Sequence, residues 1–236
     1  MNKGKLILIP VGLGNDVPHE QLPQHNADIV NLLDEFIVEN VRSARRFLRA
    51  TGYTKNFDEV IFHILDKQTS PEEIPSFLSG MQKGKDAGLL SEAGNPCIAD
   101  PGSKVVKLAH ELDIEVIPLV GPSSILLGLI ASGFNGQNFC FHGYLPVEKK
   151  ERQKKIKVLQ QDVFQKDQTQ IFMETPYRND ALLNDLLTIC HDNTLLCIAA
   201  DISLPDQFIK TRYIKHWKKN KPGLHKKPSV FLLYKE

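Results

Sequence analysis

Short apolar runs alternate with helical patterns through the first half of the chain. Strands are predicted at residues 6–9, 35–39, 87–91 and 114–119. Helices are predicted at residues 42–48, 70–82, 101–112 and 122–133. Strands that alternate with helices at this spacing pair in parallel through right-handed crossovers, and helices cover both faces of the sheet. Residues 1–136 are therefore predicted to form an N-terminal α/β domain.

One of these helices has a marked start. Ser70 is placed to cap it, Pro71 occupies the first helical position, and Glu73 lies at the capping-box position. The pattern predicts one helix that runs to about Gln82.

A new series of predicted strands and helices begins after residue 136. Strands are predicted at 139–145, 169–175 and 194–201, with a charged segment at 148–161 and a helix at 179–189. Residues 207–217 and 228–234, joined through Pro222-Gly223, predict an antiparallel pair. Residues 137–236 are expected to be a second, mixed α/β domain.

Composition narrows the class of protein. The chain has 236 residues, with 29 Lys and Arg against 28 Asp and Glu, so its net charge of +1 excludes histone-like binding over the whole surface. The four cysteines form no C-x-x-C pair, so we expect no metal site and a reducing compartment. No apolar run approaches the length of a membrane span or a signal peptide. A soluble, cytoplasmic protein without membrane contact is expected.

The loops that follow the predicted strands hold the unusual residues. They span 12–15, 91–96 and 120–124, and ligands bind at this edge of a parallel sheet. The segment 91–102 contains two glycines, two prolines and several hydrogen-bonding side chains, which favours a backbone cradle for a ligand. The alternative is a strand-to-helix connection that only needs tight turns. Neither a phosphate-binding P-loop nor a G-x-S-x-G nucleophile motif is present.

Positive charge is concentrated locally. The clusters are Arg42, Arg45, Arg46 and Arg49; Lys149, Lys150, Arg152, Lys154, Lys155 and Lys157; and Lys210, Arg212, Lys215, Lys218, Lys219, Lys221, Lys226 and Lys227. Each could bind phosphates or be a solvated face. Tyr213 and Trp217 lie within the last cluster and would add stacking surface for nucleic acid.

Six ordered motifs resemble the tetrapyrrole methylase superfamily over about residues 5–234. They are Pro10-Val11-Gly12-x-Gly14-Asn15, residues 91–102, Pro118-x-x-Gly121-Pro122-Ser123-Ser124, Ser132-Gly133, Phe139-x-Phe141-x-Gly143-Tyr144-Leu145-Pro146 and Glu174-Thr175-Pro176-Tyr177-Arg178. Within the superfamily, the chain is most similar to the bacterial branch that 2′-O-methylates a cytidine of small-subunit ribosomal RNA.

The resemblance implies two α/β domains that hold S-adenosylmethionine between them, usually in a homodimer and without a metal. By position, it assigns the cofactor contacts to Gly12, Gly14, Asn15, Gly94, Asn95, Ile98, Ser124, Ile125, Met173, Ala200 and Pro228. Met173, Ala200 and Pro228 would line the pocket for adenine and ribose.

The chain departs from this branch where a substrate would bind. It reads Glu39-Asn40-Val41-Arg42 for Glu-Asp-Thr-Arg, Ser91-Glu92-Ala93-Gly94-Asn95-Pro96 for Ser-Asp-Ala-Gly-Thr-Pro, Pro176-Tyr177-Arg178 for Pro-His-Arg, and Asp201-Ile202-Ser203-Leu204 for Glu-Leu-Thr-Lys. By the same resemblance, a C-terminal module that many of those enzymes carry is expected to be missing. A divergent paralogue is therefore expected.

Methyl transfer to a hydroxyl benefits from a base. The candidate bases are Asp100, Glu39 and Glu174. Asp100 could instead cap the helix that follows it, and Glu39 could pair with Arg42. Arg42 and Arg178 are assigned to substrate binding, because a guanidinium does not release its proton near neutral pH.

The sequence thus predicts an S-adenosylmethionine-dependent methyltransferase that acts on RNA, at a ribose 2′-hydroxyl of ribosomal RNA. Its expected partner is ribosomal RNA or the small ribosomal subunit. Two alternatives stay open: a methylase of a tetrapyrrole or another small metabolite, and a non-catalytic S-adenosylmethionine-binding paralogue.

Overall fold

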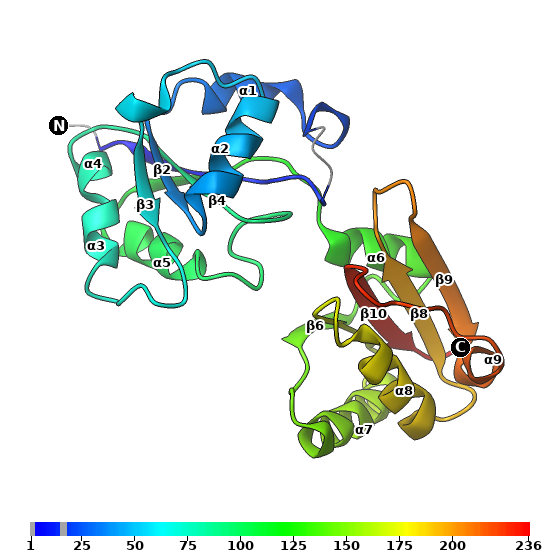
Figure 1. Ribbon diagram of the computed structural model, residues 1–236. Coiled ribbons are helices and arrows are strands. Elements are labelled where there is room, and N and C mark those ends of the chain that lie inside the picture. The colour runs from blue at the N-terminus through cyan, green and yellow to red at the C-terminus, as the bar shows by residue number, and fades with distance from the viewer. Residues whose placement is uncertain (1–2, 15–17) are drawn as a thin grey trace. The chain divides into compact units, whose positions relative to one another are not determined.

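The computed structural model describes residues 3–14 and 18–236, and its contacts divide the chain into two compact units (Figure 1). Unit 1 ends at Ser123 and unit 2 begins at Ser124. The sequence placed the boundary after residue 136, within the loop that follows helix α6 (Ser124–Ser132). The structure differs because Gly128 and Leu129 of α6 pack on the sheet of unit 2, so this helix belongs to the second core.

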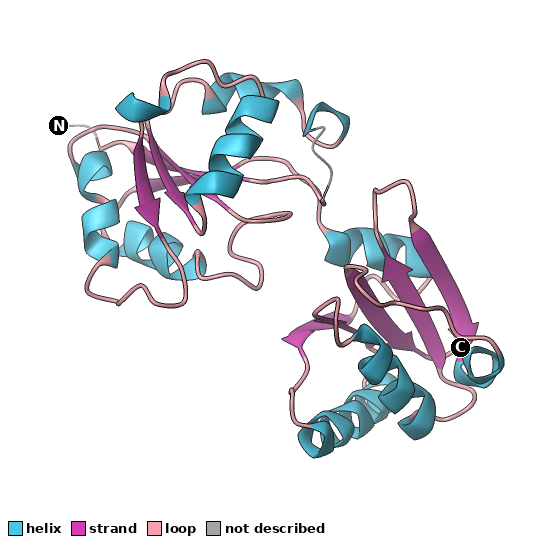
Figure 2. Ribbon diagram, viewed as in Figure 1, coloured by secondary structure: helices cyan, strands magenta, loops and turns pink. Residues whose placement is uncertain are grey.

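Unit 1 is built on a five-stranded parallel sheet in the order β3-β2-β4-β1-β5 (Figure 2). Its strands are β1 (Lys5–Ile9), β2 (Glu35–Val38), β3 (Ile61–Ile64), β4 (Ala87–Leu90) and β5 (Glu115–Pro118). Its helices are α1 (Gln24–Val30), α2 (Val41–Ala50), α3 (Ile74–Phe77), α4 (Ser79–Gln82) and α5 (Ser103–Glu111), with 3₁₀ turns at Pro18–Glu20 and Phe57–Glu59. The predicted parallel α/β arrangement is confirmed.

Both faces of this sheet are covered, because successive strand residues point to opposite sides. On one face, Ile7 and Phe36 pack with Phe47 of α2. On the other face, Leu6 and Ile37 pack with residues of α3, α4 and α5. The carboxyl ends of the strands therefore all meet at one edge of a buried sheet.

The single helix predicted over 70–82 is wrong in its extent. Glu73 Oε1 does accept a bond from the Ser70 amide at 3.0 Å, as the capping box requires. The helix nevertheless begins at Ile74 and is interrupted at Leu78, giving two short helices. Pro75 explains the late start, since its nitrogen cannot donate to the carbonyl of residue 71 and its ring crowds that turn.

Unit 2 contains a mixed five-stranded sheet in the order β6-β7-β10-β8-β9. Its strands are β6 (Phe139–Tyr144), β7 (Thr169–Glu174), β8 (Leu195–Ala200), β9 (Phe208–Tyr213) and β10 (Ser229–Tyr234). Besides α6, its helices are α7 (Lys149–Gln165), α8 (Asn179–Ile189) and α9 (Ile214–Lys219). Only β6 and β7 are parallel; the other three pairings are antiparallel, which confirms the predicted mixed sheet.

The predicted pairing of the last two extended segments is wrong. β10 pairs with β7 and β8, while β9 pairs only with β8, so β8 separates the two segments that were expected to form a hairpin. The first segment also ends at Tyr213, where α9 begins. Trp217 lies in that helix, is 1% exposed and donates from Nε1 to the Leu196 carbonyl at 2.9 Å. It is therefore a core residue and offers no stacking surface.

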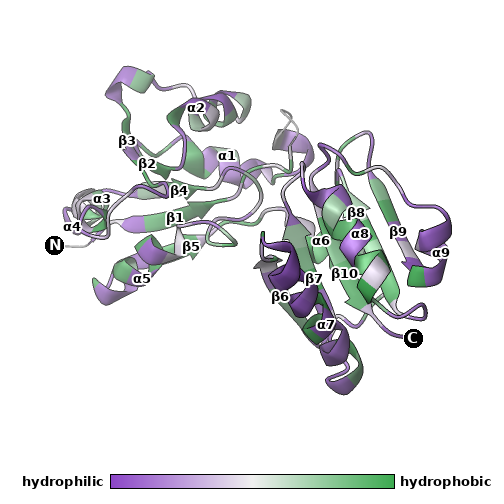
Figure 3. Cartoon of the chain, turned by 60° about the horizontal axis from the view of Figure 1, so that its bottom comes forward, coloured by the Kyte–Doolittle hydropathy of each residue, from purple (hydrophilic) through white to green (hydrophobic). Residues whose placement is uncertain are grey.

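The sheet of unit 2 lies between α6 on one face and α7, α8 and α9 on the other. Its central strands are strongly apolar, as Figure 3 shows for β10 and β8. Within the described part of the chain, no helix is long and apolar enough to cross a membrane.

Candidate functional site

Three loops of unit 1 come together beyond the carboxyl ends of β1, β4 and β5. Val11 and Gly94 exchange two backbone hydrogen bonds of 2.9 Å, which join the first loop to the second. Gly94 has a φ of +70°, a conformation that favours glycine. A Cβ on Gly121, in the third loop, would lie 2.1 Å from Pro10 Cβ and 3.2 Å from Asn95 Oδ1. The contact between these loops therefore depends on the absence of a side chain at position 121.

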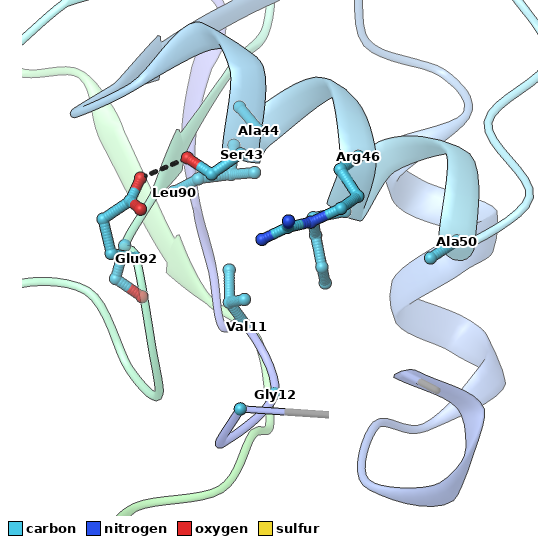
Figure 4. A pocket seen from close by; sticks show the side chains of 11 residues that line it. Val11, Gly12, Ser43, Ala44, Arg46, Ala50, Leu90 and Glu92 are labelled. Carbon is cyan, nitrogen blue, oxygen red and sulfur yellow. Dashed lines mark hydrogen bonds between the residues drawn. The ribbon is translucent and has the colours of Figure 1, made fainter. Parts of the chain in front are cut away.

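A pocket of about 130 Å³ opens between the first two loops and helix α2 (Figure 4). Backbone of Gly12 and Gly14 forms one wall, and α2 forms the facing wall. Arg46 reaches from α2 into this space toward Val11 (Figure 4). The pocket thus combines accessible loop backbone with a cation.

Ser43 and Glu92 close one side of the pocket. The Ser43 hydroxyl donates to Glu92 Oε1 at 2.6 Å and contacts the Asn40 carbonyl at 3.0 Å. No sequence motif pointed to Ser43, although residues 43, 46, 47 and 50 recur at helical spacing and all line the pocket. This spacing on α2, the helix that directly follows β2, is the sequence signal that could have identified Ser43 as a pocket residue.

Asp100 organises the second loop. Its carboxylate accepts bonds from the Cys97 amide at 2.9 Å and the Gly102 amide at 2.8 Å. It thereby supports the positive φ of Cys97 and Ala99, 71° and 63°. Because these amides occupy Asp100, its carboxylate anchors the turn. The alternative that Asp100 caps the following helix is wrong, since α5 has Gly102 at its N-cap and no side-chain cap. That Asp100 acts as a base stays a prediction.

Glu39, at the end of β2, shares a shallow groove with Asp100. Partial burial raises the pKa of the Glu39 carboxyl above its usual range, and the nearby charges of Asp100 and Glu92 raise it further. A raised pKa makes a carboxylate a better proton acceptor near neutral pH. Among the three candidate bases, Glu39 has the environment that suits the role best.

Glu174 is held by Arg178 in unit 2. Its Oε1 accepts from Arg178 Nη2 at 2.5 Å and from the Thr175 amide at 2.6 Å, and its side chain is fully buried. Arg178 Nε also donates to Thr175 Oγ1 at 3.1 Å. The predicted base and the predicted substrate-binding arginine are therefore partners in one ion pair that fixes a turn.

The cofactor residues predicted in unit 1 lie along the converging loops. Gly12 is buried, and Gly14 is exposed with a φ of +90°. Asn95 is half-buried beside Gly121, whereas Ile98 is 51% exposed. Asn15 lies outside the described residues.

The cofactor residues predicted in unit 2 have mixed environments. Ser124 and Ile125 open α6 and are half-buried, and Met173 is half-buried near the end of β7. The Ala200 side chain is completely buried in the core, so only its backbone could face a ligand. Pro228 is exposed, and its carbonyl accepts from the Asp201 amide at 2.9 Å.

The first basic cluster divides into two parts. Arg45 and Arg49 lie over the ring of Phe57, with guanidinium-to-centroid distances of 5.3 and 4.0 Å. Arg42 is exposed at the start of α2, and Arg46 lines the pocket. Two of the four arginines therefore support the fold, and two are positioned near the loops.

No group of His, Cys, Asp and Glu in residues 3–14 and 18–236 could hold a metal ion. All four cysteines are free thiols. The chemistry available at this edge therefore comes from loop backbone, the Glu39, Glu92 and Asp100 carboxylates, and the arginines of α2.

The comparison with known families agrees with the motifs and the fold. Residues 5–215 match the family described as Tetrapyrrole (Corrin/Porphyrin) Methylases. The chain belongs to this family. Its methyl donor is S-adenosylmethionine, which confirms the predicted cofactor and the assignment of the chain as a methyltransferase.

The chain is similar to bacterial proteins named Ribosomal RNA small subunit methyltransferase I. The protein from Buchnera aphidicola subsp. Schizaphis graminum is 30% identical, over 99% of this chain and 79% of its own length. The protein from Bacillus subtilis is also 30% identical, over 88% of this chain and 67% of its own length. The crystal structure of the methyltransferase CobJ has the same fold, with a TM-score of 0.65, 15% identity, and coverage of 98% of this chain and 94% of that one.

Proposed function

We propose that this chain transfers a methyl group from S-adenosylmethionine to RNA, at a ribose 2′-hydroxyl of small-subunit ribosomal RNA. One observation carries the proposal: similarity at 30% identity extends over 99% of the chain to a relative named as a ribosomal RNA small subunit methyltransferase. The acceptor atom comes from the motif resemblance. Supporting this substrate, basic residues recur in both units.

The loops of unit 1 fit the cofactor. The Val11–Gly94 pairing and the side-chain-free position at Gly121 bring backbone of three loops to one edge, so that a ligand can approach the main chain closely. Carboxylates of Glu39 and Glu92 lie at the same edge and suit a ligand that carries a sulfonium and an ammonium. Gly12, Gly14, Gly94 and Asn95 would hold it, and when bound it supplies the methyl group.

The protein's own contribution is alignment and proton removal. Bound S-adenosylmethionine would supply the methyl group to the acceptor oxygen, and the proton of that hydroxyl would go to a base of the protein. Glu39 is the base in this proposal, because its pKa is raised and it lies beside the loops. Arg42 and Arg46 bind phosphates that flank the target ribose, which fixes the hydroxyl relative to Glu39.

We further propose that the enzyme is a cytoplasmic homodimer, the usual assembly that the resemblance implies. Exposed apolar side chains in α6, among them Ile130 at 78%, are available for such a contact. Sedimentation of the full chain would test this part.

The proposal is tested by incubating the full chain with tritiated S-adenosylmethionine and small ribosomal subunits from a strain that lacks the gene. We expect label in ribosomal RNA, recovered as a nucleotide that resists alkaline cleavage because its 2′-oxygen is methylated. Asn95→Arg, which places a bulky cation among the cofactor loops, should abolish transfer.

Each other outcome has a defined meaning. Label on a tetrapyrrole but not on RNA would replace the RNA proposal with the small-metabolite alternative. Binding of S-adenosylmethionine without transfer to RNA or subunits would favour the non-catalytic alternative. RNA binding that weakens steeply between low and moderate salt supports phosphate contacts.

A further inference from the structure

An exposed aromatic and basic surface lies in unit 2, at the edge of the sheet where β7 ends and β10 begins. We propose that Tyr177 is a stacking platform for an unstacked base of single-stranded RNA, with Lys226 binding an adjacent phosphate. This inference rests on the proposed function, because it specifies where and how the RNA substrate is held.

The first observation is exposure. Tyr177 is 71% exposed, although large aromatic side chains of soluble proteins are usually mostly buried. Its ring meets the His225 ring edge-on, with centroids 5.9 Å apart and an interplanar angle of 70°. An edge contact orients the tyrosine ring while leaving face area open for another aromatic ring.

The second observation is that the turn presenting Tyr177 is tied on both sides. Within the turn, the Arg178 amide donates to the Thr175 carbonyl at 2.9 Å, and the Glu174–Arg178 ion pair joins its two ends. Across the turn, the Lys226 amide donates to the Pro176 carbonyl at 3.0 Å. A ring on so constrained a turn loses little conformational entropy when a base stacks on it.

The third observation is charge. No Asp or Glu occurs between residues 207 and 235, while the segment that carries His225 contains Lys219, Lys221, Lys226 and Lys227. Lys227 is bound to Asp201 Oδ2 at 2.6 Å, and Lys221 donates to Asn184 Oδ1 at 2.7 Å. Lys226 is exposed and directly follows His225 in the chain, and its amide bonds the turn that carries Tyr177.

An aromatic ring next to a lysine suits RNA with splayed bases more than duplex RNA. Bases in single-stranded segments can stack on aromatic side chains, whereas paired bases in an A-form helix are not accessible in this way. Buried Glu174 and half-buried Arg178 are then positioning residues, because their ion pair holds the turn that presents Tyr177.

The test measures binding of the full chain to a 12-nucleotide single-stranded RNA that contains 2-aminopurine, whose fluorescence is quenched by stacking. Loss of one base–aromatic stack should weaken binding of Tyr177→Ala by about 5- to 100-fold and relieve the quenching, while Tyr177→Phe keeps both. Tyr144→Ala, at another exposed tyrosine, is the matched control and should bind like the unchanged protein.

Salt dependence separates the two residues. Lys226→Ala should lower the slope of log affinity against log salt by about 0.7, while Tyr177→Ala should leave that slope unchanged. Binding of Tyr177→Ala within twofold of the unchanged protein, or equal loss in Tyr144→Ala, would overturn the inference. A duplex of the same sequence that binds as tightly, with the same loss in Tyr177→Ala, would overturn it as well.

The proposed function is read separately. If the unchanged chain transfers tritium to small subunits and Tyr177→Ala binds the oligonucleotide normally, only the stacking platform is rejected. If the unchanged chain binds S-adenosylmethionine but neither the oligonucleotide nor ribosomal RNA at low salt, both the platform and the RNA substrate are rejected.

Discussion

Arg152 and Asp185 form a buried, two-pronged ion pair between α7 and α8. Arg152 donates from Nε at 2.8 Å and from Nη2 at 2.6 Å to Asp185 Oδ2, and the two residues are 6% and 5% exposed. Arg152 Nη1 also donates to the Val147 carbonyl at 2.9 Å. The arginine that the charge pattern placed in a phosphate-binding cluster therefore stabilises unit 2.

Removing one partner of this pair should be costly, because the other charge stays buried without compensation. We expect Arg152→Ala to lower the free energy of unfolding by about 3–5 kcal/mol in urea denaturation. Lys154→Ala, which removes an exposed ion pair with Glu151 on the same helix, should change it by less than about 0.5 kcal/mol. Equal effects of the two variants would contradict the structural role of Arg152.

A methyl group at position 121 should damage the proposed cofactor site. In Gly121→Ala, the new Cβ must push Pro10 and the first loop away, since it would lie 2.1 Å from Pro10 Cβ. We expect the affinity for S-adenosylmethionine, measured by calorimetry, to fall about tenfold or more, a loss of at least ~1.4 kcal/mol. Gly136→Ala has open space around its Cβ and should bind normally; unchanged affinity in both would show that the loop contact does not matter for binding.

Replacing Glu39 by Gln should stabilise the fold but reduce methyl transfer. Its pKa is raised in the folded state, first by burial and then by Asp100 and Glu92, so ionised Glu39 destabilises the fold. The penalty is absent below the unfolded pKa of about 4.5 and develops as pH rises through the folded pKa. Glu39→Gln should therefore raise the melting temperature by roughly 1–2 °C at pH 7 and leave it unchanged near pH 4.

The same variant should lose methyl transfer by about 100-fold or more, because a positioned base contributes at least that factor. Glu59→Gln, at an exposed carboxylate of unit 1, is the control for both measurements. A lower melting temperature for Glu39→Gln at pH 7 would refute the charge argument, and full activity would remove Glu39 from the mechanism.

The thiol of Cys97 should react slowly despite its partial exposure. Burial and the charge of Asp100 raise its pKa to about 11, so only about one thiol in a thousand is ionised at pH 8. Iodoacetamide labelling followed by mass spectrometry should show a rate far below that of free cysteine. Asp100→Asn should speed the labelling, since it removes the nearby negative charge; no acceleration would mean that burial alone controls this thiol.

The sequence predicted those features that depend on local pattern. Apolar runs and the glycines after them located β1, β4 and β5 with their loops, because parallel strands place their carboxyl ends at one edge. It could not predict partners that are distant in the chain. Arg152 meets Asp185 33 residues away, and Trp217 donates to a carbonyl 21 residues away, so a basic residue and an aromatic residue were both assigned to the surface.

The same limit explains the site residues. The candidate bases were chosen by type and motif, but only the structure shows that amides occupy Asp100, that Arg178 holds Glu174, and that Glu39 lies among like charges. Hydrogen-bond partners and burial separate three carboxylates that look equivalent in the sequence.

The position of β10 has a consequence for synthesis of the protein. This strand, Ser229–Tyr234, lies between β7 and β8 and supplies hydrogen bonds to both, so the second sheet lacks its middle until residue 234 has left the ribosomal exit tunnel. The sheet of unit 1 is complete once β5 has emerged, more than a hundred residues earlier. During translation the first unit can therefore fold on the nascent chain. The edges of β7 and β8 that pair with β10 stay unpaired until that strand has emerged.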